Sequence, residues 1–415
     1  MAATLSTYTS ALKEVLLPYI QDNYPKETPL LDSFKRDVNQ HFINDEWLFP
    51  IRNSRHGGVA NLANDGNNIV SSSGARTTRG TVSPRRITGA FDISDMVIRA
   101  SKKGQGAVEA DLTFQSETLA ADFGRHINRQ LYSDGVGVVS QVLGSVSGTE
   151  ASVMYPDANL DDGRSIDWYG TINGDIDPMK YIHVDQILGI GTGGAADGTV
   201  AAVTGTSVQF TGTLTTAAND ALYIQDGSGA GAGTSEIQGI RAALSSSTGA
   251  STYAGLARST NSWTPQFGSS SEALTLSRME RQYLKSLEYA RKGDKYAIFC
   301  NITLFQKYAD TLQAMRRTVN SLELVGGFSG LEFQAGGGKV GVFPDYEVPD
   351  GELAILNLDT WGLLQIDDVD WLGDPNSGEL LRLQNTTLYQ AVLVWYANVV
   401  NIAPAANARE TRKSD

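Results

Sequence analysis

The sequence contains one cysteine and four histidines among its 415 residues. A single cysteine, Cys300, excludes a disulfide framework within the chain. It follows Tyr296-Ala-Ile-Phe, which fits a buried small apolar side chain in a strand. The histidines are scattered, with no two at a spacing typical of metal ligands: His41, His56, His126 and His183. We therefore expect no metal and no cofactor.

Long apolar runs and a basic character are also missing. No segment comes near the roughly 18 apolar residues of a membrane helix, and no basic stretch followed by an apolar core stands near the N-terminus, so neither a membrane span nor a secretory signal is expected. The formal net charge of -13 argues against a general nucleic-acid-binding protein, which normally carries a basic face. What is present, 41% hydrophobic residues over this length, is enough for the cores of two or three domains.

Motifs of catalytic chemistry are incomplete where they occur. Gly336 to Lys339 is similar to a phosphate-binding loop, but the initial glycine spacing and the following Ser or Thr are absent, so a β-turn is expected. The segment from Asp157 to Trp168 begins like a calcium loop, yet its sixth position is aspartate and its twelfth is tryptophan. No Gly-x-Ser-x-Gly elbow occurs. The sequence therefore predicts a protein that is not an enzyme.

One long helix is the clearest element in the chain. Its apolar residues recur on one stripe of a helix: Leu112, Leu119, Phe123, Ile127 and Leu131. Acidic residues towards its start, basic residues towards its end and Gly135 beyond the last turn mark both ends. From Leu112 to Asp134, at about 1.5 Å per residue, it spans roughly 33 Å, longer than an ordinary globular helix.

The segment in front of this helix, from Ile51 to Lys103, is polar, rich in glycine and serine, and flanked by two strand-like runs. We expect a long hairpin with a loose tip, whose second arm runs from Thr81 to Arg99. If about fifteen residues of each arm pair, the hairpin projects roughly 50 Å. Because a two-stranded ribbon is not stable alone in water, it is expected to lie on another copy of the chain.

A projecting basic hairpin followed directly by a long helix that ends in Asp134-Gly135 resembles the major capsid protein of tailed bacteriophages, with the fold named after phage Hong Kong 97. Later stretches add to the resemblance: Ser251 to Trp263, the helix after Leu274, and the closing run from Thr387 to Asn398. The order of these elements carries the resemblance, and no single motif does. It implies an α+β capsid fold with an N-terminal arm, an extended β-hairpin loop, a peripheral domain with the long spine helix, an axial domain, and here a small all-β insertion.

This pattern divides the chain into seven segments. They are the N-terminal arm (1–47), the extended hairpin loop (48–103), the spine helix with the first part of the peripheral domain (104–185), the all-β insertion (186–235), the axial domain (236–342), the peripheral-domain strands (343–385), and the C-terminal axial strand with the tail (386–415). Within the axial domain, periodicity and a capping box at Ser277 predict a helix from about Thr275 to Gly293. A strand from Lys295 to Cys300 and a helix from about Thr303 to Met315 are expected to follow.

Composition sets the insertion apart. From Gln186 to Ser235 there is no lysine or arginine, glycine recurs, and short strand-like runs appear. A disordered linker is the alternative, but the apolar residues gather in the runs, which favours a folded, separable module: Val208, Phe210, Leu214, Leu222, Tyr223 and Ile224. In the capsid family, insertions of this kind stand on the outer surface.

Charge is segregated along the chain. The segment from Ile51 to Lys103 has a net charge of +6, and the segment from Phe343 to Leu380 holds ten acids and no base. Solvated faces are the ordinary explanation of such runs. Arginine against carboxylate on this scale better suits two surfaces that meet between chains, because guanidinium binds carboxylate bidentately. The expected inter-subunit contact residues are Arg76, Arg79, Arg85 and Arg86 on one side and Asp367, Asp368 and Asp370 on the other.

The resemblance implies a structural protein that self-assembles into pentamers and hexamers of an icosahedral phage head enclosing double-stranded DNA, located in the virion capsid and assembled in the host bacterial cytoplasm. Implied partners are further copies of the chain, a portal protein, a decoration protein as a further candidate, and packaged DNA contacted without sequence specificity. A separate scaffolding protein is expected because fewer than fifty residues precede the hairpin. Some relatives form an isopeptide bond from a loop lysine, but no lysine lies between Lys35 and Lys102.

Two alternatives remain open. An encapsulin-like compartment shell would share the fold but enclose enzymes. An extracellular β-rich adhesin would account for the Gly, Thr and Ala content but requires a signal sequence, which the N-terminal residues do not provide.

Overall fold

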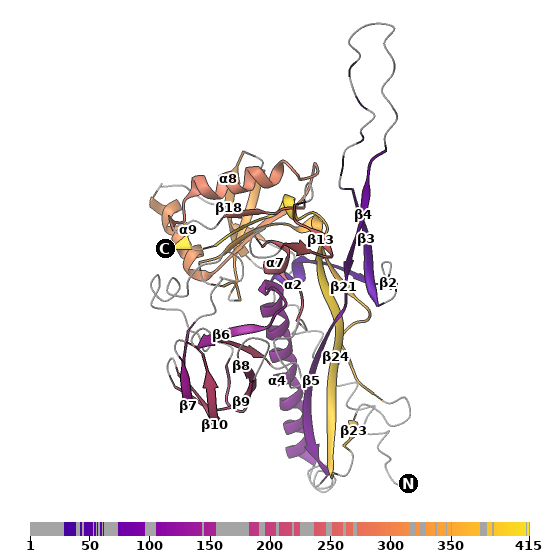
Figure 1. The fold of residues 1–415 in the computed structure, drawn as a ribbon, viewed down its shortest axis with the longest axis vertical. Helices are drawn as coiled ribbons and strands as arrows, with labels where there is room; N and C mark the ends of the chain where they lie inside the picture. The colour runs from indigo at the N-terminus through magenta and orange to yellow at the C-terminus, as the bar shows by residue number, and fades with distance from the viewer. Residues whose placement is uncertain are drawn as a thin grey trace.

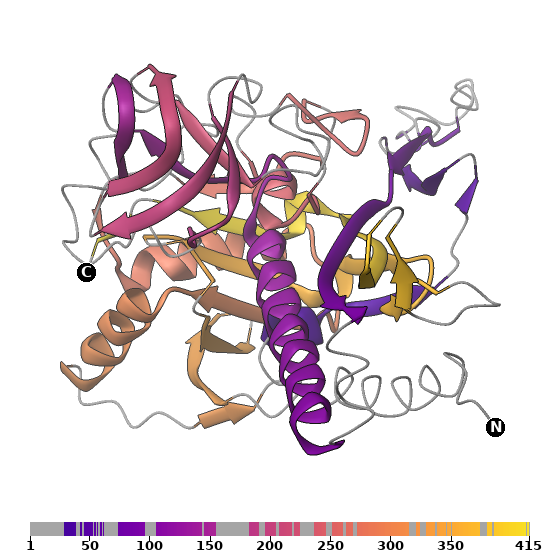
Figure 2. The same cartoon turned by 90° about the horizontal axis from the view of Figure 1, so that it is seen from below.

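Two sheets, a barrel and a projecting ribbon make up the fold (Figures 1 and 2). The structure is a computed structural model that describes residues 29–38, 42–43, 45–52, 54, 56, 59, 61, 74–95, 105–142, 145–154, 182–190, 196–204, 207–217, 220–224, 236–245, 251–259, 263–268, 272–314, 321–323, 329–336, 338–345, 347–349, 351–373, 380–383, 386–411 and 413–414. None of the described helices is both long enough and apolar enough to cross a bilayer.

The first sheet, which we call the long sheet, is organised on β24 (Leu388–Asn401). β5 (Arg85–Ser94) pairs with one side of β24 in antiparallel fashion over ten residues. Three strands share the other side: β21 (Trp361–Gln365), β22 (Asp370–Trp371) and β23 (Leu380–Arg382). β1 (Lys35–Val38) adds to β21 in parallel, after the short helix α2 (Pro29–Ser33).

The spine helix α4 (Gln105–Tyr132) packs against β5. Gly89 of β5 permits the approach, because a Cβ there would lie 3.0 Å from Leu119 Cδ1. Phe123, Ile127 and Leu131 are buried and Leu119 packs against the same core, so the long helix and these positions of its apolar stripe are confirmed, whereas the side chain of Leu112 lies outside the described residues. The helix begins seven residues earlier than the periodicity from Leu112 indicated. Its C-terminal end reaches α7 (Ile240–Ala243), and both helices belong to the same hydrophobic core as the long sheet.

The second sheet, the wide sheet, has seven strands. Their spatial order is β14 (Gln266–Gly268), β25 (Ala408–Glu410), β20 (Leu353–Asn357), β16 (Tyr296–Cys300), β19 (Gly338–Pro344), β18 (Ser329–Ala335) and β17 (Ser321–Glu323). The helices α8 (Leu276–Leu287) and α9 (Ile302–Ala314) pack on it around a core that includes Ile298 and Val342. The predicted strand and second helix of this region are confirmed. The first helix, α8, is confirmed with its start after Thr275. The predicted capping box at Ser277 is wrong, because Thr275 is the N-cap and makes no side-chain cap hydrogen bond, and the helix ends at Leu287 and not at Gly293.

The closed barrel has six strands: β6 (Val138–Val142), β7 (Val146–Met154), β8 (Ile187–Ile190), β9 (Ala196–Thr204), β10 (Ser207–Thr216) and β11 (Ala221–Ile224). It encloses its own hydrophobic core. The boundary of the predicted insertion at 186 is therefore wrong, because β6 and β7 lie in front of it and pair with β11 and β10. The module is a folded β structure, but it starts at Val138.

The ribbon consists of β2 (Phe42–Ile43), β3 (Glu46–Arg52) and β4 (Thr77–Val82). Figure 1 shows it extending from the upper end of the long sheet, away from the body. The two long arms pair over six residues, from Trp47 opposite Val82 to Arg52 opposite Thr77. The expected fifteen-residue pairing is wrong, because the second half of the predicted arm is β5 and pairs with β24 instead.

Small elements complete the fold: β12 (Thr252–Tyr253) with β13 (Leu256–Ala257), β15 (Glu272–Ala273) with β26 (Lys413–Ser414), and the 3-10 helices Leu358–Thr360 and Pro404–Ala406. The distribution of strands between the two sheets differs from the predicted division of the chain into segments. β20, expected among the peripheral strands of 343–385, lies inside the wide sheet, and β24, expected as an axial strand within 386–415, is the centre of the long sheet. The end of the predicted arm 1–47 joins the core, where Leu30 and Leu31 are fully buried.

Candidate functional site: surfaces for assembly

The described residues hold no cluster of three or more His, Cys, Asp or Glu side chains that could bind a metal ion. The incomplete calcium loop at 157–168 lies outside them. Gly336 to Lys339 spans the turn between β18 and β19, as predicted. Burial raises the pKa of the Cys300 thiol to about 12, so the group stays protonated at neutral pH.

The ribbon carries two of the predicted contact residues on its exposed surface. Arg76 immediately precedes β4 and Arg79 lies within it, and both side chains are exposed. Neither makes an ion pair with any residue that the structure describes. Gly80 faces the ring of Phe49, where a Cβ would come within 2.5 Å of the ring, so the strands lie close together. The ribbon therefore presents free guanidinium groups beyond the body.

The root of the ribbon is fixed to the body by hydrogen bonds. The backbone N–H of Thr81 donates to the carbonyl oxygen of Ala254 at 3.0 Å. The side-chain amide of Asn398, on β24, donates to the carbonyl oxygen of Ser83 at 2.7 Å. These bonds set the direction in which the ribbon leaves the long sheet.

Arg85 and Arg86 do not lie on the ribbon. They begin β5, opposite Ala397 and Tyr396 of β24. Arg86 is exposed, but Arg85 is half-buried, and desolvation lowers the pKa of its guanidinium. The expectation that this pair lies on the projecting hairpin is therefore wrong, because the second half of the predicted arm is a strand of the long sheet.

The three predicted acidic contact residues lie together at the edge of the long sheet. Asp367 and Asp368 occupy the turn between β21 and β22, and Asp370 begins β22. The turn is held by Gln365 Nε2, which donates to Asp368 Oδ1 at 2.7 Å. All three carboxylates are exposed, and the flanking Ile366 and Leu372 expose 38% and 43% of their surface. We call these five residues the acidic turn.

Two other acids of the predicted acidic segment are not on a surface. Asp345 is buried, accepts hydrogen bonds from Tyr132 Oη at 2.8 Å and Asn128 Nδ2 at 3.2 Å, and desolvation raises its pKa. Glu352 is buried between two guanidinium groups, with Arg409 Nε and Arg241 Nη2 each at 3.0 Å. The sequence-based prediction assigned all ten acids to one outward surface. That assignment is wrong for Asp345 and Glu352, because both are buried and bonded to groups of the same chain.

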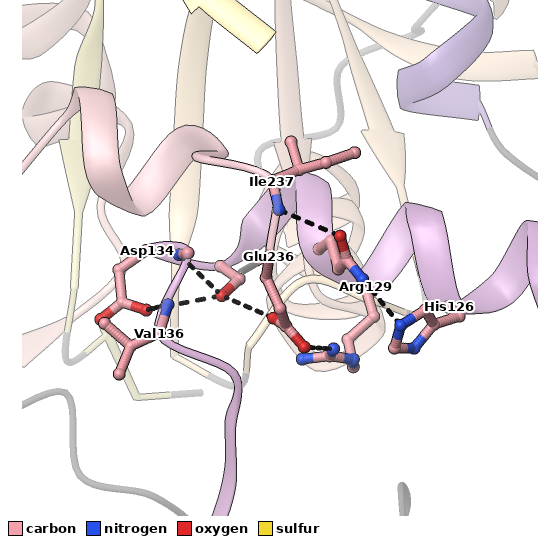
Figure 3. Close-up of polar contacts among 9 residues, drawn as sticks. His126, Arg129, Asp134, Val136, Glu236 and Ile237 are labelled. Carbon is pink, nitrogen blue, oxygen red and sulfur yellow. Dashed lines mark hydrogen bonds and ion pairs between the residues drawn. The ribbon is translucent and has the colours of Figure 1, made fainter. Parts of the chain in front are cut away.

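A cluster that sequence reasoning missed joins the end of α4 to the barrel and α7 (Figure 3). Arg129 of α4 forms a buried ion pair with Glu236, and the Ser133 hydroxyl donates to Glu236 Oε2 at 3.4 Å. The backbone N–H of Ile237 donates to Gln130 Oε1 at 3.0 Å. We call this cluster, with His126, the joint. Arg129 and Glu236 are separated by 107 positions, so no local motif signals their contact.

His126 of the joint is held in its neutral form. The amide nitrogen of Gln130 lies 2.7 Å from His126 Nε2, and a neutral ring can accept that hydrogen bond. Burial, and secondarily the charge of Arg129, lower the pKa of His126 to about 3. The ring lines an open cavity of about 510 Å³ between α4 and the barrel, together with Asp122, Arg125 and His183.

Comparison with known proteins identifies the fold. No family model matches the chain, and no curated protein is similar to it in sequence. Among solved structures, a chain of the capsid asymmetric unit of cyanophage A-1(L) superposes with a TM-score of 0.52 at 13% identity, over 94% of this chain and 93% of that chain. The SrpI encapsulin of Synechococcus elongatus PCC 7942 gives a TM-score of 0.46 at 7% identity, over 94% of this chain and 89% of that chain. The chain has the fold of the cyanophage capsid chain, so the predicted capsid-type α+β fold is confirmed.

Proposed function

We propose that this chain is the structural subunit of an icosahedral phage head, a major capsid protein that assembles as pentamers and hexamers around double-stranded DNA. The observation that carries the proposal is the ribbon, which leaves the body of a capsid fold and bears exposed arginines without ion-pair partners among the described residues. A short isolated ribbon is at best marginally stable in water. A neighbouring copy in a shell supplies the support that the body does not.

The acidic turn is the proposed docking surface for the ribbon of the next copy. It combines three exposed carboxylates with two exposed apolar side chains, whereas the ribbon brings Arg76 and Arg79. Arginine binds carboxylate bidentately, and apolar contacts around such pairs exclude water. Arg86, exposed on the long sheet, is a secondary candidate for the same contact, and Arg85 a weaker one because it is half-buried.

Negative-stain electron microscopy of the purified chain, alone and with Arg76→Glu and Arg79→Glu, tests the proposal. The parent is expected to form capsomers or shells. The double variant is expected to remain folded, because both side chains are exposed, and to lose shells. Exposed ion pairs contribute about 0 to 1 kcal/mol each, but the loss repeats at every interface of the shell. Changing Asp367, Asp368 and Asp370 to lysine in the same chain is expected to restore part of the assembly.

The control is Lys307→Glu with Arg382→Glu, which changes the net charge equally on α9 and β23. It is expected to assemble like the parent. The proposal is wrong if the parent stays monomeric at all concentrations. The ribbon contact alone is wrong if the Arg76 and Arg79 variant forms shells at the same salt concentration as the parent.

Further partners belong to the same proposal: a separate scaffolding protein, a portal protein, a decoration protein and packaged DNA bound without sequence specificity. Closed shells formed by the chain alone, loaded with protein and not DNA in the host cell, would instead favour an encapsulin-like compartment. The extracellular adhesin considered from composition is not supported, because its β-rich architecture differs from the observed capsid fold.

A further inference from the structure

A basic surface lies at the end of α8 and in the turn that leads to β16. Arg281 and Lys285 are one helical turn apart, and Arg291 and Lys292 follow the helix. Between these cations two apolar side chains are exposed, Leu284 at 41% and Tyr289 at 46% of their surface. The α8 surface consists of these six residues.

None of the four cations of the α8 surface makes an ion pair within the part of the chain that the structure describes, although Glu288 lies between them in sequence and the protein has 46 acids against 33 lysines and arginines. Asp294, which is close in sequence, is already engaged by the backbone N–H of Arg291 at 2.9 Å and by Asn357 Nδ2 at 2.6 Å. The helix dipole favours cations in the last turn of a helix, which explains the position of Lys285. It does not explain Arg291 and Lys292, which lie beyond the end of α8.

The exposed apolar residues indicate what kind of partner the α8 surface fits. Contact with the phosphates of duplex DNA is made by cations and other polar groups and does not require exposed apolar side chains. Tyrosine and arginine together are instead enriched in the centres of protein interfaces, where an apolar contact is surrounded by charge pairs. The partner is therefore expected to be a protein surface that is negative and partly apolar.

The barrel has that character. Its six strands contain no lysine or arginine. Glu150 on β7 and Asp185 in front of β8 are exposed, and Asp220 in front of β11 is half-buried. β7 and β8 lie on opposite sides of the closed barrel, so a single docked surface can reach either Glu150 or Asp185 but not both. Next to Asp185, Val184 and Ile187 expose 53% and 45% of their surface.

Within one chain the two surfaces cannot meet. Figure 1 shows α8 at the top of the wide sheet and the barrel below that sheet, on the same side of the molecule. We propose that the α8 surface of one copy docks on the barrel of the next copy, in a head-to-tail contact. Such a heterologous contact uses each surface once per copy and closes into a ring when the rotation allows it. The inference rests on the proposed function, because it names a contact within the proposed pentamers and hexamers.

Zero-length carbodiimide cross-linking of assembled capsomers tests the contact directly. The reagent joins an amine to a carboxylate that touches it, and the barrel strands contain no lysine. We expect amide links from Lys285 or Lys292 to Glu150, Asp185 or Asp220, identified by mass spectrometry. In capsomers mixed from normal and 15N-labelled chains, about half of these links are expected to join one chain of each kind. Links from these lysines to other acids only would overturn the proposal.

Charge reversal provides the second test. Arg281→Glu, Lys285→Glu, Arg291→Glu and Lys292→Glu together are expected to weaken capsomer formation at least about tenfold, measured by sedimentation velocity over a concentration series. Glu150→Lys, Asp185→Lys and Asp220→Lys in the same chain are expected to recover part of it. The control, Lys307→Glu with Arg382→Glu, reverses two cations outside the α8 surface, and it is expected to leave association unchanged.

The outcomes separate this inference from the proposed function. If the parent forms capsomers and the fourfold α8 variant forms them equally well, the α8 contact is wrong and the shell function stands. If that variant assembles normally but packages less DNA, the surface binds nucleic acid, which also overturns the contact. If the parent forms no oligomer at any concentration, both proposals fail.

Discussion

Two ionisable groups near the joint, the buried Asp345 and the half-buried His126, link stability to pH with opposite signs. Desolvation raises the pKa of Asp345, so its contribution to stability is largest at low pH and is lost as the pH rises through the raised value. The pKa of His126 is lowered from 6.5 to about 3, so the folded chain binds fewer protons than the unfolded chain between these values. The contribution of His126 is therefore present at neutral pH and is lost as the pH falls.

The residue-scale prediction concerns His126→Gln, which keeps a polar side chain but cannot titrate. Urea unfolding of the unassembled parent is expected to show that the free energy of unfolding falls between pH 7.5 and 5.5. The share of His126 in that fall is about 1.4 kcal/mol, because one pH unit below the unfolded pKa costs about that amount. In His126→Gln this share is expected to vanish. Equal pH dependence of the two chains would contradict the lowered pKa.

Sequence reasoning could not find the joint, because its contacts depend on the tertiary fold. Arg129 was read only as a basic residue near the end of a helix, and Glu236 had no role. The buried acids were missed for the same reason. A charge count does not distinguish Asp345 and Glu352 from the exposed Asp367, yet each of the two is buried against hydrogen-bond donors that are distant in the sequence. Composition therefore shows which charged residues are present, but it does not show which groups they contact in the fold.

At the scale of elements, local signals predicted α4, β16 and α9 because helix periodicity and a short apolar run are properties of neighbouring residues. Strand pairing was harder. β5 was read as an arm of the hairpin because it follows β4 after only two residues, Ser83 and Pro84. Its alternating pattern indicates that one face of the strand is covered, but it does not indicate which strand pairs with it. The partner, β24, is about 300 positions away in the sequence, so no local signal predicts the pairing.

The barrel yields the element-scale prediction. It has its own core, and the N–H of Ile224 donates to the carbonyl oxygen of Gly137 at 3.2 Å, so its two ends lie together. Replacing Val138 to Ile224 by a short Gly-Ser linker is expected to leave a soluble, cooperatively folded body, as seen by circular dichroism and thermal unfolding. Folding is the readout, because the barrel also carries one of the proposed ring contacts. An insoluble product would show that the barrel supports the body.

A second variant serves as the comparison. Replacing only 186–235 removes four of the six strands and leaves β6 and β7 with most of their partners missing. Unpaired edge strands promote aggregation, so this variant is expected to be the less soluble of the two. The predicted boundary fell at 186 because the lysine and arginine content changes abruptly there. The first two barrel strands were missed because residues 155–186 separate them from the other four.

At the scale of the whole molecule, the resemblance predicted the fold class, and the comparison with the cyanophage capsid chain confirms it. The distribution of strands over the two sheets was not predicted, because β20 and β25 reach the wide sheet only after the chain has returned from other parts of the fold. The contact surfaces were predicted in part: Arg76, Arg79, Asp367, Asp368 and Asp370 are exposed as expected, and their pairing between copies remains a prediction.

The net charge of -13 affects how strongly the whole molecule binds DNA. The ribbon and the α8 surface are the two basic surfaces that we assign to contacts between copies, and the other exposed cations, such as Arg86, Arg125 and Arg382, lie elsewhere in the fold. Because 46 acids outnumber 33 lysines and arginines, a free subunit is expected to repel phosphate and to bind duplex DNA more weakly than about 1 µM at roughly 0.15 M salt. Fluorescence anisotropy with labelled duplexes of two unrelated sequences measures this affinity, and the two duplexes are expected to bind equally weakly.

Lowering the salt to about 0.05 M is expected to strengthen binding only slightly, because few phosphates are neutralised. Micromolar binding at the higher salt, or a preference between the two sequences, would show that the subunit carries a nucleic-acid site and that at least one of the two basic surfaces serves DNA.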